Sequence, residues 1–409
     1  MNPIQTLFIS VRALLRNKMR SFLTTLGVVI GVGAVIAMVA IGEGAKASVS
    51  AQFAAMGTDL LIVMSGSSTA SGARGGAGSA PTLTWEDVKA LRTQVRSVRY
   101  VAPNLRSNGQ VVSEEQNWMA PITGTTPEYF SIRTWPATKG TLFTQSDVDT
   151  GTKVVVLGQT VANNLFGADT NPVGQLVRIN NIPFEVVAVA ASKGQSAQGQ
   201  DYDDVVFVPS STFQAKIQGG LQKFVAGSLF IGADPALGTA AAQREITELL
   251  RERHQIRPGA PDDFTIRNLS EMANAQQEGT ETMTTLLASI AAVSLLVGGI
   301  GIMNIMLVSV TERTREIGVR MAVGAKPRHI LAQFLVESLT LSLLGGLLGV
   351  VLGTISAQQL ASRFGWTMLI RVDVTVVAVG FSAFVGVVFG LYPAYKASRL
   401  DPIQALRFE

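Results

Sequence analysis

Four long runs without a charged side chain constrain this chain more than any other feature. They are Ser21–Gly42, Thr282–Thr311, Ser338–Ser362 and Val374–Tyr395, with 22, 30, 25 and 22 residues. A helix rising about 1.5 Å per residue crosses the hydrocarbon core of a bilayer with about 20 apolar residues. Each run meets that length, so we expect four transmembrane helices.

The segment between the first two runs has the composition of a water-facing domain. Short apolar stretches alternate there with polar turns, and Thr84–Asp87 is a typical helix start. We therefore predict a polytopic α-helical membrane protein with four transmembrane helices plus a large mixed α+β extracytoplasmic domain. We expect that domain to have two lobes and to end in a helical stalk that continues into the second span.

The distribution of Lys and Arg predicts the orientation. These residues cluster before the first run, between the second and third, and after the fourth, whereas the third-to-fourth connection has only Arg363 and Arg371. Because short cytoplasmic loops carry the excess of Lys and Arg, we expect both termini to be cytoplasmic. The large domain then lies outside the inner (cell) membrane.

The net charge of +4 gives no reason to expect a nucleic-acid partner. Residues 43–282 carry 19 Lys and Arg against 23 Asp and Glu, so the positive excess lies entirely in the membrane-flanking segments.

These observations predict the layout of the chain. We expect a cytoplasmic interfacial helix at 1–20, transmembrane helices at 21–42, 282–311, 329–362 and 374–395, the extracytoplasmic domain at 43–281, a coupling loop or helix at 312–328 and a cytoplasmic tail at 396–409.

Small and polar residues inside the runs are candidates for packing or function. Glycines that recur every four residues allow helices to approach closely. The helices can belong to one bundle or to two subunits, and we favour packing within one bundle. The glycines are Gly27, Gly31, Gly345, Gly349, Gly353, Gly386 and Gly390. Asn304 and Glu337 are polar groups at membrane depth. Glu337 alternatively lies at the cytoplasmic interface beside Arg328.

Motifs for catalysis are absent from the sequence. No Gly-Lys pair occurs, so there is no phosphate-binding loop, and neither a GxSxG nor an HExxH motif is present. The chain has no cysteine and only two histidines, His254 and His329, which we expect to face solvent. The adjacent acids Asp203 and Asp204 should do the same. We expect no enzyme activity and no bound cofactor or metal.

The loop after the second run predicts a short helix. Its residues 315–323 end at Gly324, a typical helix stop, with Pro327 starting the next helix. Ile317 and Met321 share one face of that helix. An exposed apolar face with charges around it can dock in a groove on a partner, or the segment is a basic membrane-flanking turn. The charged residues are Arg313, Arg315, Glu316 and Arg320.

The same segment carries a family resemblance. TERTREIGVRMAVGAKPRHILAQFLVES closely resembles the MacB-type ABC transporter permeases, within the wider FtsX/LolC-like group. RNKMRSFLTTLGVVIGVGAVIAMVAIGEGA, YPAYKASRLDPIQALRFE, TPEYF and VVVLGQTVANNLFG are also similar to that family, so the resemblance covers nearly the whole chain. MacB itself carries an ATPase domain at its N-terminus, so we expect a permease-only form served by a separate ATPase.

The resemblance implies a homodimer above a dimer of cytoplasmic ABC ATPases, which use ATP and Mg. It implies that one lobe of the outer domain is formed from both ends of the segment and that the other is inserted between them. It also implies mechanotransmission, in which ATP-driven closure in the cytoplasm tilts the stalks. Residues 313–328 would be the coupling segment, with contacts at Glu316, Ile317, Arg320 and Met321.

Three functions fit this resemblance. The first is export of drugs, peptides or other small molecules, with a periplasmic adaptor protein and an outer-membrane duct. The second is release of lipoproteins from the membrane, and the third is signalling to cell-wall hydrolases. The length of the outer domain favours export over signalling.

The predicted topology can be tested by thiol labelling, because the chain contains no native cysteine. A cysteine replacing Ser71 should react in intact cells with a membrane-impermeant thiol reagent. A cysteine replacing Ala325 should react only after permeabilisation, since we expect it in the cytoplasm. Equal labelling at both positions in intact cells would contradict the four-span topology.

Overall fold

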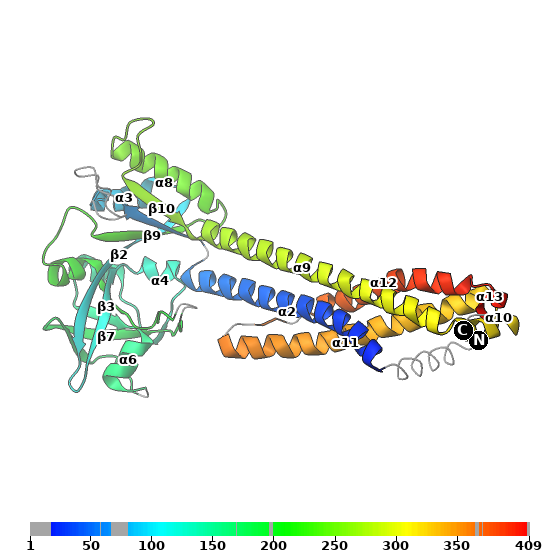
Figure 1. Cartoon of the computed structure of the whole chain (residues 1–409). Coiled ribbons are helices and arrows are strands. Elements are labelled where there is room, and N and C mark those ends of the chain that lie inside the picture. The colour runs from blue at the N-terminus through cyan, green and yellow to red at the C-terminus, as the bar shows by residue number, and fades with distance from the viewer. Residues whose placement is uncertain are drawn as a thin grey trace, which may run out of the picture. The chain divides into compact units, whose positions relative to one another are not determined.

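The computed structural model describes residues 18–406 except 58, 67–80, 169, 196–198, 365–367 and 370. Most of the interfacial helix expected at 1–20, and Ser71, therefore lie outside the described residues. The chain divides into two compact units (Figure 1). The membrane unit comprises residues 1–48 and 277–409, and the α/β unit comprises residues 49–276. The boundary falls inside two helices, α2 (Lys18–Met56) and α9 (Leu269–Glu312).

The membrane unit confirms the prediction of a polytopic helical protein. Its helices α2, α9, α11 (Pro327–Phe364) and α12 (Val372–Ser398) are long and apolar enough to cross a membrane. Two shorter helices accompany them, α10 (Thr314–Ala322) between α9 and α11, and α13 (Pro402–Leu406) after α12. Because α2 has 39 residues and α9 has 44, each is about twice as long as a bilayer crossing requires.

Glycine backbones lie at the crossings of these helices. A Cβ atom added to Gly27 would lie 3.1 Å from the Cα of Gly298, and one added to Gly353 would lie 2.6 Å from the carbonyl oxygen of Gly33. The other glycines singled out in the sequence also meet neighbours within the unit: Gly31 meets Leu295, Gly345 meets Val28, Gly349 meets Val32, Gly386 meets Ser342 and Gly390 meets Ser338. The contacts of these glycines therefore pack the bundle of a single chain.

The α/β unit is built on one ten-stranded sheet with the order β10-β1-β9-β2-β3-β8-β5-β7-β4, and β6 pairs with β2 and β7. Its strands are β1 (Leu60–Ser65), β2 (Val98–Val112), β3 (Asn117–Thr125), β4 (Ala137–Gly140), β5 (Val154–Leu157), β6 (Leu176–Ile179), β7 (Ile182–Ala190), β8 (Val206–Pro209), β9 (Gly227–Ala233) and β10 (Phe264–Asn268). This mixed architecture confirms the predicted α+β domain.

The long strand β2 joins two groups of strands. Its first part, from Val98 to Leu105, pairs with β9, and its second part, from Leu105 to Val112, pairs with β3. Strands from the two ends of the segment, β1, β9 and β10, thus lie on one side of β2. The strands inserted between them, β3 to β8, continue the sheet on the other side. At Leu105 the strand changes partner.

Helices cover the sheet, and alternating side chains form two cores. The helices are α3 (Trp85–Gln94), α4 (Glu128–Ile132), α5 (Gln145–Thr150), α6 (Gln159–Phe166), α7 (Ser210–Thr212), followed by the π-helical turn η2 (Phe213–Ile217), and α8 (Thr239–Arg253). Leu61 belongs to one core and its neighbour Leu60 to the other, as the period of two in a strand requires. The second core is rich in aromatic rings, including Tyr129, Phe207 and Phe230.

The end of α2 fits closely against α4. Gly57, the residue after α2, has a positive φ of 106°, which a glycine adopts without strain. A Cβ atom there would lie 2.6 Å from the carbonyl oxygen of Ile132, the last residue of α4. Only glycine therefore allows the chain to leave α2 at this distance from α4.

A charged cluster connects α3, α8 and β10. The Nδ1 atom of His254 lies 2.8 Å from Oδ1 of Asp263, and its Nε2 atom lies 3.2 Å from Oδ2 of Asp87. Arg253 donates from Nε to Oδ1 of Asp87 at 2.6 Å. The side chain of His254 is only 9% exposed, so the expectation that it faces solvent is wrong. Its partner Asp87 is far away in the sequence, and spacing gives no sign of the contact.

The cluster shifts the pKa values of its members. Burial alone would lower the pKa of His254, but hydrogen bonds to Asp263 and Asp87 outweigh burial and raise it above its ordinary value. Burial alone would raise the pKa of Asp87, but hydrogen bonds from Thr84, Arg253 and His254 lower it. The protonated imidazole therefore stabilises the folded unit.

A methyl group at the α2–α11 crossing should destabilise the bundle. Gly353→Ala places its Cβ against the backbone of Gly33, and we expect a loss of about 1–3 kcal/mol, as for other overpacked sites. Gly380→Ala is the control, because no described atom beyond the adjoining turns of its own helix lies within 4 Å of a Cβ at that position. The measurement is the temperature at which the detergent-solubilised chain, after heating, no longer elutes as a single peak from a size-exclusion column. Equal temperatures for both variants would contradict the close crossing.

The raised pKa of His254 predicts a pH-dependent stability. The folding stability that protonated His254 contributes is fully present below the ordinary pKa of histidine. It is lost as pH rises through the raised folded-state pKa. Thermal unfolding of the α/β unit in the intact chain should therefore show a loss of stability as pH rises above 6.5, the ordinary pKa of histidine. His254→Gln should flatten this dependence. The lowered pKa of Asp87 changes the folding stability only at acidic pH, where its carboxylate becomes protonated. A profile unchanged by the substitution would overturn this assignment.

Candidate coupling surface

Helix α10 is defined at both ends by local interactions. At its start, the hydroxyl of Thr314 donates to the carbonyl oxygens of Val310 at 3.0 Å and Thr311 at 2.9 Å. At its end, Gly324 has a φ of 102°, and the N–H of Ala325 donates to the carbonyl of Arg320 at 3.0 Å. The left-handed glycine stops the helix, as the sequence predicts. The observed bounds are within one residue of those expected.

The face of α10 that carries Ile317 is covered. Ile317 is fully buried in the core of the membrane unit, and Met321 packs half-buried against the same core. A Cβ atom on Gly318 would lie 2.8 Å from the Cβ of Ala405 in α13. The prediction that Ile317 belongs to an exposed docking face is therefore wrong. The short helix after the last span occupies that face, and Gly318 permits its close approach.

One ion pair and one hydrogen bond tie α10, with its N-cap residue Arg313, to α11. Arg313 lies 3.4 Å from Glu337, whose side chain is 4% exposed. Arg320 pairs with Glu316 and donates to Oε1 of Gln333 at 3.2 Å. Glu337 thus pairs with Arg313 and not with Arg328, the neighbour considered from sequence. A buried carboxylate needs such a partner, because its desolvation is otherwise costly.

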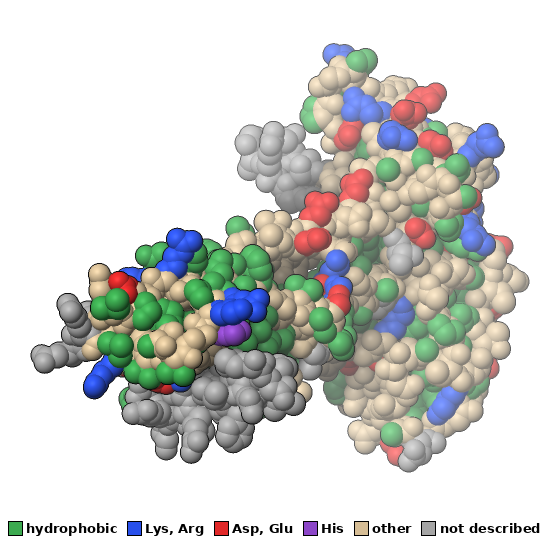
Figure 2. Space-filling model, turned by 90° about the vertical axis from the view of Figure 1, so that its right-hand side faces the viewer, with side chains coloured by type: hydrophobic (Ala, Val, Ile, Leu, Met, Phe, Trp, Pro, Cys, Tyr) green, Lys and Arg blue, Asp and Glu red, His purple; other side chains and the backbone are tan. Residues whose placement is uncertain are grey.

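The exposed side chains of α10 and α13 form what we call the coupling surface. Val319 is 48% exposed and Val323 is 84% exposed. Arg315 and Glu316 are exposed beside them. The apolar residues that α13 adds are Ile403 and Leu406. Figure 2 looks onto the end of the membrane unit that carries α10 and α13, where hydrophobic side chains are interspersed with Lys and Arg. This composition is suited to a protein partner.

Asn304 lies apart from this surface. It is on α9, and its side chain is exposed at the surface of the described bundle. Apolar side chains of α9 are exposed on the same helix, among them Ile290, Val293 and Val297. A polar side chain in a spanning helix seldom faces lipid, so Asn304 remains a candidate for contact with another subunit.

The residues that hold these elements were only partly foreseeable. Gly324 and the run of charged residues are visible in the sequence. The cover that α13 provides, and the role of Gly318 beneath it, were missed. The signal was present in the small residues Gly318 and Ala405, but a single small residue in a short helix does not identify its partner.

Comparison with protein families gives two matches. The model of the MacB-like periplasmic core domain matches residues 21–249, which include most of the α/β unit. The model of the FtsX-like permease C-terminal region matches residues 288–402, which include α10, α11 and α12. Together the two models account for both units of the structure.

Similar proteins share these regions. The macrolide export ATP-binding/permease protein MacB of Syntrophobacter fumaroxidans is 40% identical, over 99% of this chain and 64% of that protein. The protein of the same name from Azoarcus sp. is 43% identical, over 98% of this chain and 59% of that protein. The chain thus spans less than two thirds of the length of these relatives.

Solved structures with some similarity match about half of this chain. The periplasmic region of MacB from Actinobacillus actinomycetemcomitans is 26% identical, with a TM-score of 0.45 over 55% of this chain and 95% of that one. The extracellular domain of the noncanonic ABC-type transporter YknZ from Gram-positive bacteria is 18% identical, with a TM-score of 0.40 over 51% of this chain and 100% of that one.

Proposed function

The chain belongs to the family of permeases with a MacB-like periplasmic core domain and an FtsX-like C-terminal region, and from this premise we propose that it couples ATP hydrolysis to export. A cytoplasmic ABC ATPase would bind ATP and Mg, and this chain would bind neither. Conformational change in the ATPase would reach the α/β unit through the helices. In this proposal the α/β unit lies on the extracytoplasmic side and both termini are cytoplasmic.

The observation that carries this proposal is the length of α2 and α9. Each helix runs without interruption from the membrane unit into the α/β unit, with 39 and 44 residues. A hydrogen-bonded helix resists bending, so a tilt of its membrane portion is carried to its other end. The close contact of Gly27 with Gly298 lets the two helices move together. This is the physical basis of mechanotransmission.

The coupling surface is the proposed contact with the ATPase. Val319 and Val323 supply exposed apolar area, and Arg315 and Glu316 supply charge for orientation. Interface energy is concentrated in a few desolvated side chains. Arg313, Arg320 and Ile317 would act differently, by holding α10 against α11 and α13. Met321, half-buried, would support the same packing.

A second copy of the chain is the proposed partner of α9. The exposed apolar face of this helix, together with Asn304, gives a surface on which two copies can pack and satisfy a polar group. A homodimer would pair with two ATPase subunits. A periplasmic adaptor and an outer-membrane duct complete the proposed pathway.

The proposed substrates are drugs, peptides or other small molecules. The names of the two MacB relatives refer to macrolide export, and this supports a small-molecule cargo for the present chain. No ionisable residue is exposed in the middle of the described spans to line an aqueous path. Transport would therefore act on substrate outside the bilayer. If the chain instead co-purifies with lipoproteins or with a cell-wall hydrolase, it performs one of the two alternative functions considered from sequence, lipoprotein release or signalling.

The test is disruption of the coupling surface. The double variant Val319→Asp, Val323→Asp should insert and fold, because both side chains are exposed. It should bind the co-expressed ATPase at least tenfold more weakly, because an unpaired carboxylate would be buried at the contact. Co-purification and stimulation of ATPase turnover are the measurements.

Two further variants serve as controls. Leu237→Asp places one negative charge on an exposed residue of the α/β unit and should leave ATPase binding unchanged. Ile317→Asp should reduce the yield of folded chain, because it buries a charge in the bundle core. Normal ATPase binding by the double variant would refute the assignment of the coupling surface.

A further inference from the structure

A cavity of about 440 Å³ opens in the α/β unit. It lies over strands β2, β3, β8 and β9 and is closed by the end of α2, by α4 and by the segment from Gln200 to Val205. All of its lining residues belong to the α/β unit. Binding sites for small molecules usually have volumes of about 300–1,000 Å³, so this cavity is large enough for one.

One wall of the cavity is aromatic. The ring of Tyr129 stacks on Phe230 with centroids 5.5 Å apart, and it lies 5.4 Å from the ring of Phe207. Trp135 meets Phe207 edge to face at 5.3 Å. Because these rings are packed against one another, their shape is fixed before a ligand enters. A flat apolar group would therefore bind without a large loss of side-chain freedom.

Arg133 places a buried cation in this wall. It follows α4 directly, and its N–H donates to the carbonyl of Tyr129 at 2.9 Å. The residue is only 8% exposed. Its guanidinium carbon lies 5.7 Å from the ring centre of Trp135 and 6.0 Å from that of Tyr202. No described residue accepts a hydrogen bond from its Nε atom. A buried donor of this kind usually has a partner.

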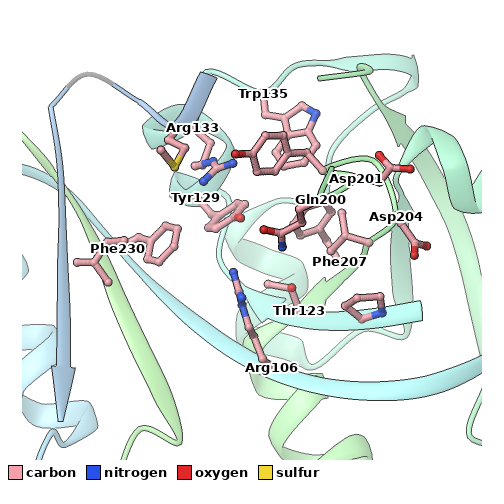
Figure 3. A pocket seen from close by; sticks show the side chains of 15 residues that line it. Arg106, Thr123, Tyr129, Arg133, Trp135, Gln200, Asp201, Asp204, Phe207 and Phe230 are labelled. Atoms are coloured by element: carbon pink, nitrogen blue, oxygen red, sulfur yellow. The ribbon is translucent and has the colours of Figure 1, made fainter. Parts of the chain in front are cut away.

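A second guanidinium faces the same space. Arg106 lies on β2 directly across from Thr123 on β3, and both line the cavity. In Figure 3 Arg106 and Arg133 approach the cavity from opposite sides, with the ring of Tyr129 between them. Among the described residues, neither guanidinium forms an ion pair with a carboxylate of the cavity wall.

The carboxylates of the wall have other partners. Asp201 accepts from the hydroxyl of Thr160 at 2.7 Å, and Asp204 accepts from Nε1 of Trp118 at 2.8 Å. Figure 3 shows both carboxylates at the end of the cavity away from Arg106 and Arg133. Their hydrogen bonds hold the segment around Asp203. Asp203 itself is buried, so the expectation from sequence that it faces solvent is wrong. The acids therefore do not neutralise the guanidinium end.

A third cation strengthens the positive potential there. Nζ of Lys193 lies 5.1 Å from the ring centre of Trp135, on which Arg133 also packs. Burial, with repulsion from Arg133, lowers the pKa of Lys193 to about 8, although Asp203 acts in the opposite direction. An anion that binds beside this lysine and arginine would favour the charged forms of both side chains.

We propose that this cavity is a binding site for a small amphipathic anion. The flat apolar body of the ligand lies against Tyr129 and the neighbouring rings. Its carboxylate or phosphate accepts hydrogen bonds from the guanidinium groups of Arg133 and Arg106, two residues that line the cavity. A planar guanidinium pairs with either group in the same geometry. The site rests on contacts within the α/β unit alone, and it does not depend on the proposed coupling to an ATPase.

A matched pair of probes tests the charge requirement. 2-Naphthoate and 2-naphthamide have nearly the same shape, but only the first carries a negative charge. Titration calorimetry on the full chain in detergent should show at least tenfold tighter binding of the carboxylate. Naphthyl phosphate, added as a third probe, distinguishes the two anionic groups. Binding to detergent is measured without protein and subtracted. Equal affinity for the naphthoate and the amide, or binding of neither, would overturn the proposal.

Variants test the residues. Arg133→Met keeps most of the apolar contact with Trp135 but removes the charge, and it should abolish the preference for naphthoate. Arg106→Gln, at an exposed position, should weaken naphthoate binding without affecting the fold. Arg178→Gln removes an exposed arginine of β6 outside the cavity and is the matched control. Should Arg133→Met not fold, unchanged naphthoate binding by Arg106→Gln would still refute the two-arginine site. A loss in the control would do the same.

Discussion

The contact between the backbones of α2 and α9 is the constraint on which the rest of the structure depends. These helices are the two covalent connections between the membrane unit and the α/β unit. In lipid, apolar side chains gain little by packing against one another, so close backbone contact has to supply the attraction. Gly27 and Gly298 provide it, and Gly33 and Gly353 extend it to α11. A larger side chain at any of these positions would separate the helices.

The large features of the fold follow from the sequence because they depend on local composition. Uninterrupted apolar runs predict the spans, and the capping box at Thr84 and Asp87 marks the start of α3. Gly324 stops α10 where a glycine was expected to stop it. Each of these signals acts within a few residues. They needed no knowledge of the tertiary structure.

The errors come from contacts between residues far apart in the chain. Ile317 has the helical spacing of a docking residue, but α13 returns from the end of the chain to cover it. His254 lies in a polar stretch, yet Asp87 and Asp263 enclose it. Arg133 gave no signal at all, because one arginine near several aromatic residues has no distinctive pattern. Periodicity reports which residues share a face and cannot report what covers that face.

The change of partner along β2 shapes the cavity. Leu105 pairs with Gly227 of β9 on one side and with Gly124 of β3 on the other. Arg106 is the next residue, at the place where β9 ends beside the strand and β3 continues. Beyond Leu105 the edge of β2 opposite β3 has no partner from β9, and it is next paired by β6 at Val111 and Val112. Neither group of strands alone would form this wall.

The close fit of Gly57 against Ile132 has a consequence for energetics. The last residue of α2, Met56, lines the cavity, and Ile132 directly precedes Arg133. The end of a membrane-spanning helix and the wall of a cavity are thus parts of one packed corner. Thermodynamic linkage is reciprocal. If displacement of the end of α2 alters the cavity, then filling the cavity must bias the position of α2 by the same free energy.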